Sequence, residues 1–169
     1  MSEFTTAPPP PSSASDLYKT IHRTCIKFFR SVSRNPANPK VINTEAVKAV
    51  RTDDFIQTFG HRFMVSHRPE YQPPITLNTL LVQLGAVSPL LNLWDMEIED
   101  IIIDEGSRKA VVRSTVELQA EGEDKPVVKN DMVWVLYLTE DGEKVRKAIE
   151  FEDSMAADTF KKTLVLDNV

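Results

Sequence analysis

The segment KPVVKNDMVWVLYL, residues 125–138, decides the fold of this chain. Side chains of an extended strand point alternately to its two faces. Apolar side chains therefore occupy both faces of this segment: Asn130, Met132, Trp134 and Leu136 on one, and Asp131, Val133, Val135 and Tyr137 on the other. Such a strand needs cover on both sides. A helical layer can supply one cover, and because the chain is short we expect a second subunit to supply the other, through the outer face of the sheet.

Three neighbouring segments show the same β-branched, alternating pattern: IEDIIID at 98–104, KAVVRSTVEL at 109–118 and EKVRKAIEFED at 143–153. Short turn signals separate the four segments at 105–107, 121–124 and 140–143. Connections of this length suit hairpins and exclude helical crossovers. The sequence therefore predicts an antiparallel meander from about Trp94 to Asp153.

Helical patterns precede the meander. Asp16, or Ser15 before it, is a plausible N-cap for a helix that ends near Ser33 and carries an apolar face: Tyr18, Ile21, His22, Cys25, Phe28 and Phe29. The remaining expectations are a short helix over 44–50, a turn or third short helix over 51–55, an irregular loop over 60–74, a leucine-rich helix over 76–91 and a final helix or extension over 156–164. Helices followed by a meander predict an α+β fold, with N-terminal helices packed on a strongly curved antiparallel sheet that can leave a conical pocket.

The composition of the 169 residues indicates one domain over 16–169, preceded by a disordered Pro/Ser-rich tail over 1–15. No apolar run approaches the roughly 18 residues of a membrane helix, so no membrane partner is expected. A net charge of −5, with no basic stripe interleaved with aromatic residues, makes nucleic acid an unexpected partner. The single cysteine and the absence of a signal peptide favour the cytoplasm, and the three histidines lack zinc-ligand spacing, so no metal is expected.

Four segments resemble a known family. Asn130-Asp131-Met132-Val133-Trp134 and Ile149-Glu150-Phe151-Glu152-Asp153-Ser154 are similar to the paired Asn-Glu-Tyr-x-Trp and Glu-Phe-Val-Asp-Ser signatures of fungal SnoaL-like proteins. The segments at 49–54 and 108–112 resemble two further motifs of that family. SnoaL-like proteins belong to the NTF2-like superfamily of cone-shaped domains. The likeness covers about residues 16–164 in element order, and its sharp motifs cover about thirty positions.

The resemblance implies a dimeric, cofactor-independent isomerase, cyclase or dehydratase of secondary metabolism, with a small-molecule substrate such as a polyketide, terpenoid or alkaloid intermediate. By position, Glu150 and Arg51 match the family's pocket-facing glutamate and arginine, and we take them as candidate catalytic residues. A carboxyl in an apolar cavity can shuttle protons near neutral pH, and an arginine can stabilise an oxyanion. The candidate substrate-binding residues are Tyr18, His22, Phe29, His61, Arg113, Asp131, Met132 and Trp134.

Other interpretations stand beside these. Alternation allows Ile149 and Phe151 to face the core, which would leave Glu150 on a solvated face. Arg51 could end a helix at the surface and pair with a nearby aspartate, and the row of Arg113, Thr115 and Glu117 could face solvent or form a pocket wall. His22 could be a core histidine that bonds a backbone partner, and His61 could lie in a lid or in a solvated loop.

A different class of function is also open. Two positions beside the family signature, typically tyrosines, are Val128 and Met132 in this chain. Neither can donate a proton, so a mechanism that relies on those tyrosines does not transfer. Their absence fits a non-catalytic carrier or dimerisation module that shelters an apolar metabolite.

Overall fold

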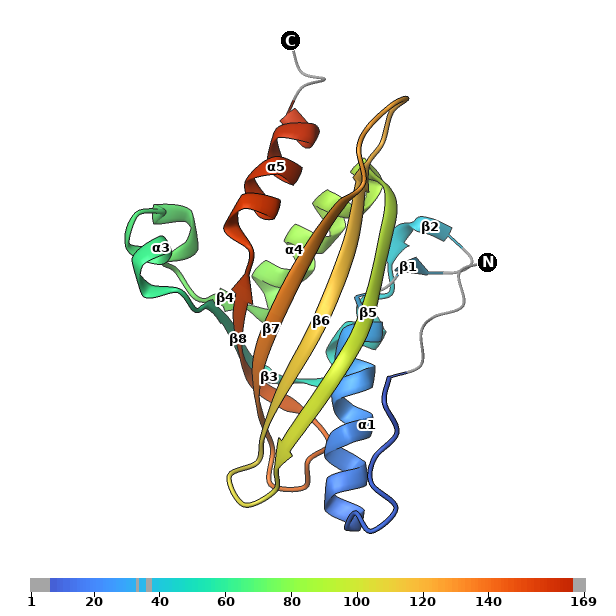
Figure 1. Cartoon of the computed structure of the whole chain (residues 1–169), viewed down its shortest axis with the longest axis vertical. Coiled ribbons are helices and arrows are strands. Elements are labelled where there is room, and N and C mark those ends of the chain that lie inside the picture. Colours follow the sequence, from blue (N-terminus) through green and yellow to red (C-terminus); the bar gives the residue numbers. More distant parts are fainter. Residues whose placement is uncertain (1–6, 33, 36–37, 166–169) are drawn as a thin grey trace.

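Six strands form one curved sheet in the computed structural model, which describes residues 7–32, 34–35 and 38–165 (Figure 1). The strands lie in the order β4-β3-β8-β7-β6-β5. Their bounds are β3 Arg51–Phe59, β4 Ile75–Thr76, β5 Leu91–Asp104, β6 Lys109–Ala120, β7 Val128–Leu138 and β8 Val145–Glu152. A separate two-stranded sheet pairs β1 (Arg34–Asn35) with β2 (Asn38–Ile42).

The predicted meander is confirmed. β5, β6, β7 and β8 pair with their neighbours in antiparallel register, and the three turns fall where the sequence places them. The prediction for 51–55 was wrong, because these residues open β3 rather than a turn or helix. β3 pairs parallel to β8, a long-range contact that no local pattern of the segment reveals. The sheet is thus antiparallel except at this one pair.

Two helices supply most of the apolar cover of the sheet. α1 (Asp16–Arg30) begins where the Ser15 side chain accepts a hydrogen bond from the backbone N–H of Tyr18, and α4 (Leu77–Val87) begins where Thr76 caps Thr79 in the same way. The predicted ends were too late, since α1 stops at Arg30 and α4 gives way to the 3₁₀ helix η2 (Ser88–Leu90). Together the two helices bury a row of apolar side chains in the core: Ile21, Cys25, Phe28, Phe29, Leu77, Leu80 and Leu84.

Shorter helices complete the chain. The 60–74 segment is a loop that holds two brief helical turns, α3 (Arg62–Ser66) and the 3₁₀ helix η1 (Pro69–Tyr71). The remaining helices are α2 (Thr44–Ala49) and α5 (Ser154–Val165). α5 packs against β6 and β7 beyond the end of the meander, so it closes one end of the sheet (Figure 1).

β7 shows the predicted two-sided character. Val128, Asn130, Met132, Trp134, Leu136 and Leu138 are buried on its inner face. On its outer face Val133 keeps 38% of its surface exposed, and Val111 on the neighbouring strand keeps 37%. The inner face therefore belongs to the core beneath the helices, and the outer face carries exposed apolar side chains.

The first six residues of the predicted tail lie outside the described residues. Ala7 packs against the core, and the carbonyl oxygen of Pro8 lies 2.8 Å from Nε2 of His22 on α1. Within the described part of the chain, no helix has the length and apolar character needed to span a bilayer.

Candidate active site

A cavity of about 230 Å³ lies between α1, α4 and the inner face of the sheet. We call it the central cavity. Its apolar walls come from α1 and the residue Val32 after it, from α4 and from the three strands β5, β6 and β7: Phe28, Phe29, Val32, Leu80, Leu84, Trp94, Met96, Val116, Leu118, Met132 and Trp134. Its polar groups come mostly from the parallel pair β3 and β8: Arg51, Gln57, Asn130, Glu150 and Glu152. An apolar pocket with a few convergent polar side chains is typical of a small-molecule site.

Glu150 points into this cavity and keeps only 7% of its surface exposed. It lies opposite Trp134 in the antiparallel pair of β8 and β7, and opposite residues project to the same face of a sheet. Ile149 and Phe151 project the other way and are half-buried. The alternative of a solvated Glu150 therefore does not describe this structure.

The surroundings of Glu150 favour its neutral form. Burial raises its pKa from 4.5 to about 8, and the nearby carboxylate of Glu152 adds to the rise, while the hydrogen bond from Gln57 opposes it. Nε2 of Gln57 donates that bond to Oε2 of Glu150 over 2.7 Å. At neutral pH the carboxyl is therefore mainly protonated, and it can act as an acid that donates to a bound molecule.

Arg51 is buried in the wall of the central cavity, with 2% of its surface exposed. Its Nη1 donates hydrogen bonds to Oγ of Ser31, at 2.9 Å, and to the carbonyl oxygen of Val47, at 3.1 Å. The guanidinium lies 4.0 Å from the ring centre of Phe28 and 5.3 Å from that of Phe55. Among the described residues no carboxylate pairs with it, so the alternative of a surface ion pair does not hold.

Burial without a carboxylate partner lowers the pKa of Arg51 to about 9. The side chain is still cationic at neutral pH. Its Nε has no hydrogen-bond partner within the described residues, and neither has Nε1 of Trp134. The cavity wall thus holds two unpaired donors, which a bound acceptor oxygen could satisfy.

Glu152 is a second carboxylate in the wall, two residues beyond Glu150 on the same face of β8. It also lines a shallower pocket formed by α3 and the start of α5, so it stands between the central cavity and the outer surface. Burial raises its pKa, and the Tyr71 hydroxyl and the Lys161 ammonium partly offset this rise. Lys161 in turn donates to the Tyr71 hydroxyl over 2.7 Å.

Several solved structures of other proteins share the fold of this chain. The chain matches the BvnE pinacolase of Penicillium brevicompactum with a TM-score of 0.71 at 17% identity, covering 92% of this chain and 99% of that one. It matches PrhC of Penicillium brasilianum with a TM-score of 0.71 at 17% identity, over 89% and 91% of the two chains. A protein described as a SnoaL-like polyketide cyclase, from Jannaschia sp. CCS1, matches with a TM-score of 0.65 at 11% identity, over 89% and 96%. The chain has the SnoaL-like fold.

No protein-family model and no curated protein sequence matches the chain, so the shared fold is what these comparisons establish. The expected NTF2-like cone is confirmed. The two segments that carry the sharpest resemblance, 130–134 and 149–154, overlap neighbouring strands of the SnoaL-like fold, with Trp134 opposite Glu150 and Met132 opposite Glu152. Motifs that lie apart in the sequence thus form one wall of the central cavity.

The SnoaL-like fold brings five of the ten candidate site residues to the central cavity: Glu150, Arg51, Phe29, Met132 and Trp134. It places the other five elsewhere. Tyr18 lies outside the cavity near the start of α1, and His22 is a buried residue that contacts the Pro8 carbonyl, as the core-histidine alternative states. His61 precedes α3 in the outer pocket, where its ring meets the edge of Phe151.

Arg113 and Asp131 are the last two, and they pair with each other on the outer face of the sheet at 2.9 Å. Each sits one residue away from an inward-facing position, so strand alternation sends it outward. The solvent-facing alternative for this row is therefore the correct one. Neither residue can touch a molecule in the central cavity.

Sequence reasoning missed Gln57, Asn130 and Glu152 as members of the site. Gln57 was hidden because β3 was not recognised, and without that strand no pattern places it beside Glu150. Glu152 had a usable signal, since residues i and i+2 of a strand share a face. Asn130 was assigned to the same face as Met132 and Trp134, and its Oδ1 also accepts a hydrogen bond from the backbone N–H of Asp153 at 3.0 Å.

Proposed function

We propose that the chain is a cytoplasmic, cofactor-independent isomerase or cyclase that acts on a small, largely apolar secondary metabolite by acid/base proton transfer in the central cavity. The observation that carries the proposal is Glu150, a buried carboxyl with a pKa near 8, set in an apolar pocket with Gln57 as its hydrogen-bond donor. A group that changes protonation near neutral pH can both give and accept a proton in one catalytic cycle. The pinacolase and cyclase names of proteins with this fold support the reaction class.

The polar groups suggest a division of roles. Protonated Glu150 donates to an oxygen of the substrate, and Arg51, cationic and lacking a carboxylate partner among the described residues, stabilises negative charge that develops on a second oxygen. After the bond rearrangement, the Glu150 carboxylate accepts a proton from carbon or oxygen and returns to its starting state. No net proton is consumed, as an isomerisation or cyclisation requires.

The walls restrict the substrate. A volume of about 230 Å³ lies below the range of roughly 300–1,000 Å³ that is usual for ligand sites. The lining is mainly aromatic and aliphatic, from Phe28, Phe29, Leu80 and Trp134. A compact, mostly hydrocarbon skeleton with one or two oxygens fits this lining, whether its source is a polyketide, terpenoid or alkaloid pathway.

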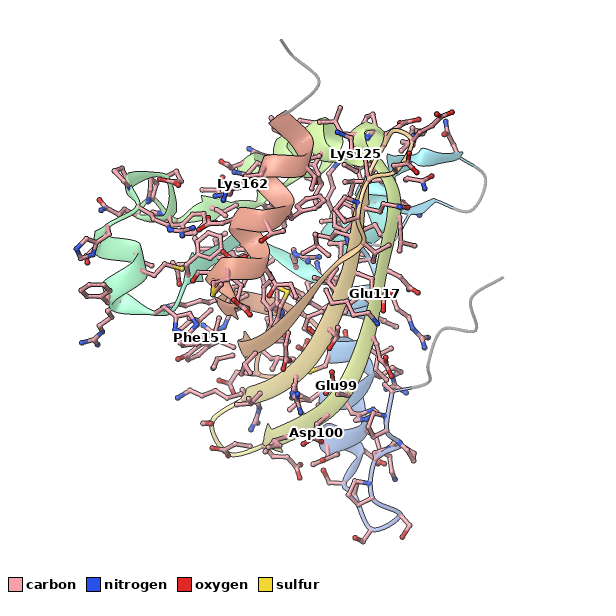
Figure 2. All side chains as sticks on the ribbon, turned by 45° about the horizontal axis from the view of Figure 1, so that its top comes forward. Glu99, Asp100, Glu117, Lys125, Phe151 and Lys162 are labelled. Carbon is pink, nitrogen blue, oxygen red and sulfur yellow. The ribbon has the colours of Figure 1, made fainter. Side chains whose placement is uncertain are left out.

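A gene replacement tests the function. In the organism that encodes the chain, the Glu150→Gln variant should accumulate an unconverted metabolite, and mass spectrometry of extracts should detect it. An isomer of the lost product indicates isomerisation or cyclisation, and a metabolite heavier by one water indicates dehydration. The matched control is Glu117→Gln, a carboxylate on the outer face that pairs with Lys129 (Figure 2). An unchanged metabolite profile in the Glu150→Gln strain would favour the non-catalytic carrier.

We also propose that two copies of the chain pair through the outer face of the sheet. Ile102, Val111 and Val133 all leave more than a third of their surfaces exposed there. Ion pairs of Arg113 with Glu99 and Asp131 cross the same face and can fix the register of a partner. The dimer would cover the apolar side chains that the helices do not reach.

A further inference from the structure

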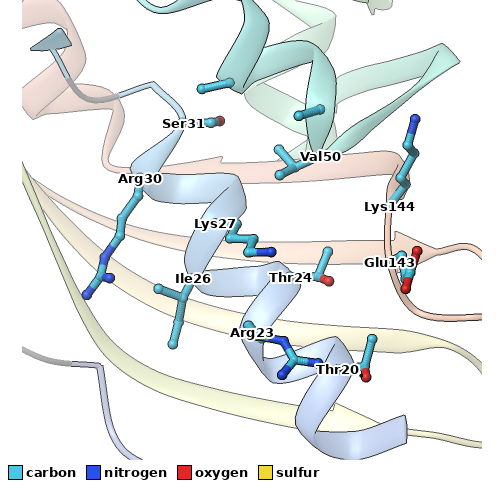
Figure 3. Close-up of a pocket in the computed structure, with 12 residues that line it drawn as sticks. Thr20, Arg23, Thr24, Ile26, Lys27, Arg30, Ser31, Val50, Glu143 and Lys144 are labelled. Carbon is cyan, nitrogen blue, oxygen red and sulfur yellow. Dashed lines mark hydrogen bonds between the residues drawn. The ribbon is translucent and has the colours of Figure 1, made fainter.

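A second hollow lies beside α1 (Figure 3). We call it the α1 groove. Its walls are α1, the end of α2 and the turn between β7 and β8, and its volume is about 890 Å³. It shares no lining residue with the central cavity. A substrate bound in the central cavity would therefore not occupy this larger hollow.

Four cations line the α1 groove. Arg23, Lys27 and Arg30 stand on α1 at spacings of four and three, so they share one face of the helix. They span about 10 Å along its axis at 1.5 Å per residue. Lys144 stands on the β7–β8 turn, across the hollow from α1 (Figure 3). A molecule in the groove would meet positive charge from both sides.

These four cations form no ion pair within the described residues, although Glu143 also lines the groove. Elsewhere in that part of the chain, ion pairs with carboxylates are common: those of Lys19, Lys40, Lys48, Arg68, Arg108, Arg113, Lys129 and Lys161. Lys27 and Arg30 also complement the dipole at the end of α1, but this does not account for Arg23 or Lys144. The whole chain carries a net charge of −5, so the local excess of positive charge is not a general property of its surface.

Between the cations the groove offers two further kinds of contact. Thr24 is 4% exposed, lines the groove and makes no hydrogen bond within the described residues, so its hydroxyl is free for a ligand. The apolar side chains of Ile26, Ala46, Ala49 and Val50 cover the adjoining wall. The combination suits a molecule with an apolar body and an anionic head.

We propose that the α1 groove binds a small organic phosphate, a molecule with one or two phosphate groups on an apolar body. Guanidinium groups match the geometry of phosphate oxygens, and several cations that lack an ion pair among the described residues favour an anion with more than one charge. Neighbouring cations on α1 are three or four residues apart, a spacing that a diphosphate can bridge. The volume is that of a small-molecule site rather than of a macromolecular interface.

Calorimetric titration tests the proposal with two probes, inorganic diphosphate and phenyl phosphate. The full chain should bind both, and it should bind phenyl phosphate more tightly than inorganic phosphate, titrated as a reference without a ring, because the apolar wall receives the ring. Lys27→Gln with Arg30→Gln should weaken diphosphate binding about tenfold or more, since two charge-assisted contacts are lost. Thr24→Val should weaken it less, and added salt should weaken it in every variant that binds.

Lys162→Gln is the matched control, an exposed lysine on α5 at the far end of the molecule from α1 (Figure 2). It should leave diphosphate affinity within about twofold. Lys144→Gln lies on a turn and tests the site without altering α1, should the double variant fail to fold. Equal diphosphate affinity in all variants, or no binding by the unaltered chain, would overturn the proposal. Binding to phosphatidic acid vesicles without binding to either soluble probe would also overturn it, in favour of a lipid surface.

Discussion

Gln57 and Glu150 meet across the parallel pair of β3 and β8, where Nε2 of Gln57 donates to Oε2 of Glu150 over 2.7 Å. The amide fixes the orientation of the carboxyl and lowers its pKa. Burial and the charge of Glu152 act in the opposite direction and prevail. The protonation state of Glu150 therefore depends on a strand pairing between distant parts of the sequence.

Removal of the amide should raise the pKa of Glu150 further. Gln57→Leu keeps the size of the side chain and deletes the donor, so the carboxylate form loses its stabilising hydrogen bond. The pKa of Glu150 should move above about 8, as measured by a carbon-13 NMR titration of the glutamate carboxyl groups. Gln72→Leu, at an exposed position, should leave it unchanged. A pKa that falls in Gln57→Leu would show that the amide does not stabilise the carboxylate.

Glu150 should make the folded state less stable as pH rises. Its pKa is about 8 in the folded chain against an ordinary value of 4.5, so the folded state binds the proton more tightly. Its contribution to stability is complete below pH 4.5 and is lost as pH rises through 8, with a total on the order of a few kcal/mol. Glu150→Gln should flatten this part of the profile when the free energy of urea unfolding is measured from pH 5 to 9. An identical slope in the variant would contradict the raised pKa.

Arg51 should contribute to stability mainly through the packing of its side chain. Arg51→Ala leaves a cavity beside Phe28 and deprives Ser31 and Val47 of a donor, which should cost about 3 kcal/mol in the free energy of unfolding. Arg51→Met restores the stem and removes the buried charge, so it should recover much of that loss. Urea denaturation of both variants measures the difference. Equal losses would show that the guanidinium group itself, rather than the side-chain volume, stabilises the fold.

One charge introduced into the proposed dimer interface should halve the mass of the particle in solution. Val133→Glu places a carboxylate in the outer face of β7 without touching the central cavity, and in a symmetric interface the charge occurs twice. Size-exclusion chromatography with light scattering should show a dimer for the unaltered chain and a monomer for the variant. Lys162→Gln should remain dimeric. A monomeric unaltered chain would leave the exposed Val111 and Val133 without a partner.

The fold was largely predictable because its signal is local. Alternation and turn residues between Trp94 and Asp153 specify the four meander strands, and the apolar spacing of α1 and α4 specifies the helices. β3 was not predicted because it is specified by its pairing with β8. The paired residues lie far apart in the sequence: Gln57 and Ala148, for example, are more than ninety residues apart. Its first residues, Arg51 to Asp54, carry the charges and turn formers of a loop.

The site was predictable only in part. Periodicity could place Met132 and Trp134 on one face, but it could not say whether Glu150 shared that face, since β8 has apolar side chains on both sides. The register of Trp134 with Glu150 decides the matter, and register is a tertiary property. Family resemblance supplied the correct face for Glu150 and Arg51. It could not correct Arg113 and Asp131, which alternation sends to the outer surface.

The metabolite that accumulates in the Glu150→Gln strain allows the most direct test of the central claim, that Glu150 transfers the proton in turnover. Purified unaltered chain and Glu117→Gln should convert this metabolite at equal rates. Glu150→Gln should bind it with similar affinity. It should convert it at least about a hundredfold more slowly, which is the usual contribution of a general acid. In the unaltered chain the rate should fall above pH 8, where the acid form is lost. Equal turnover by Glu150→Gln and the unaltered chain would contradict the account.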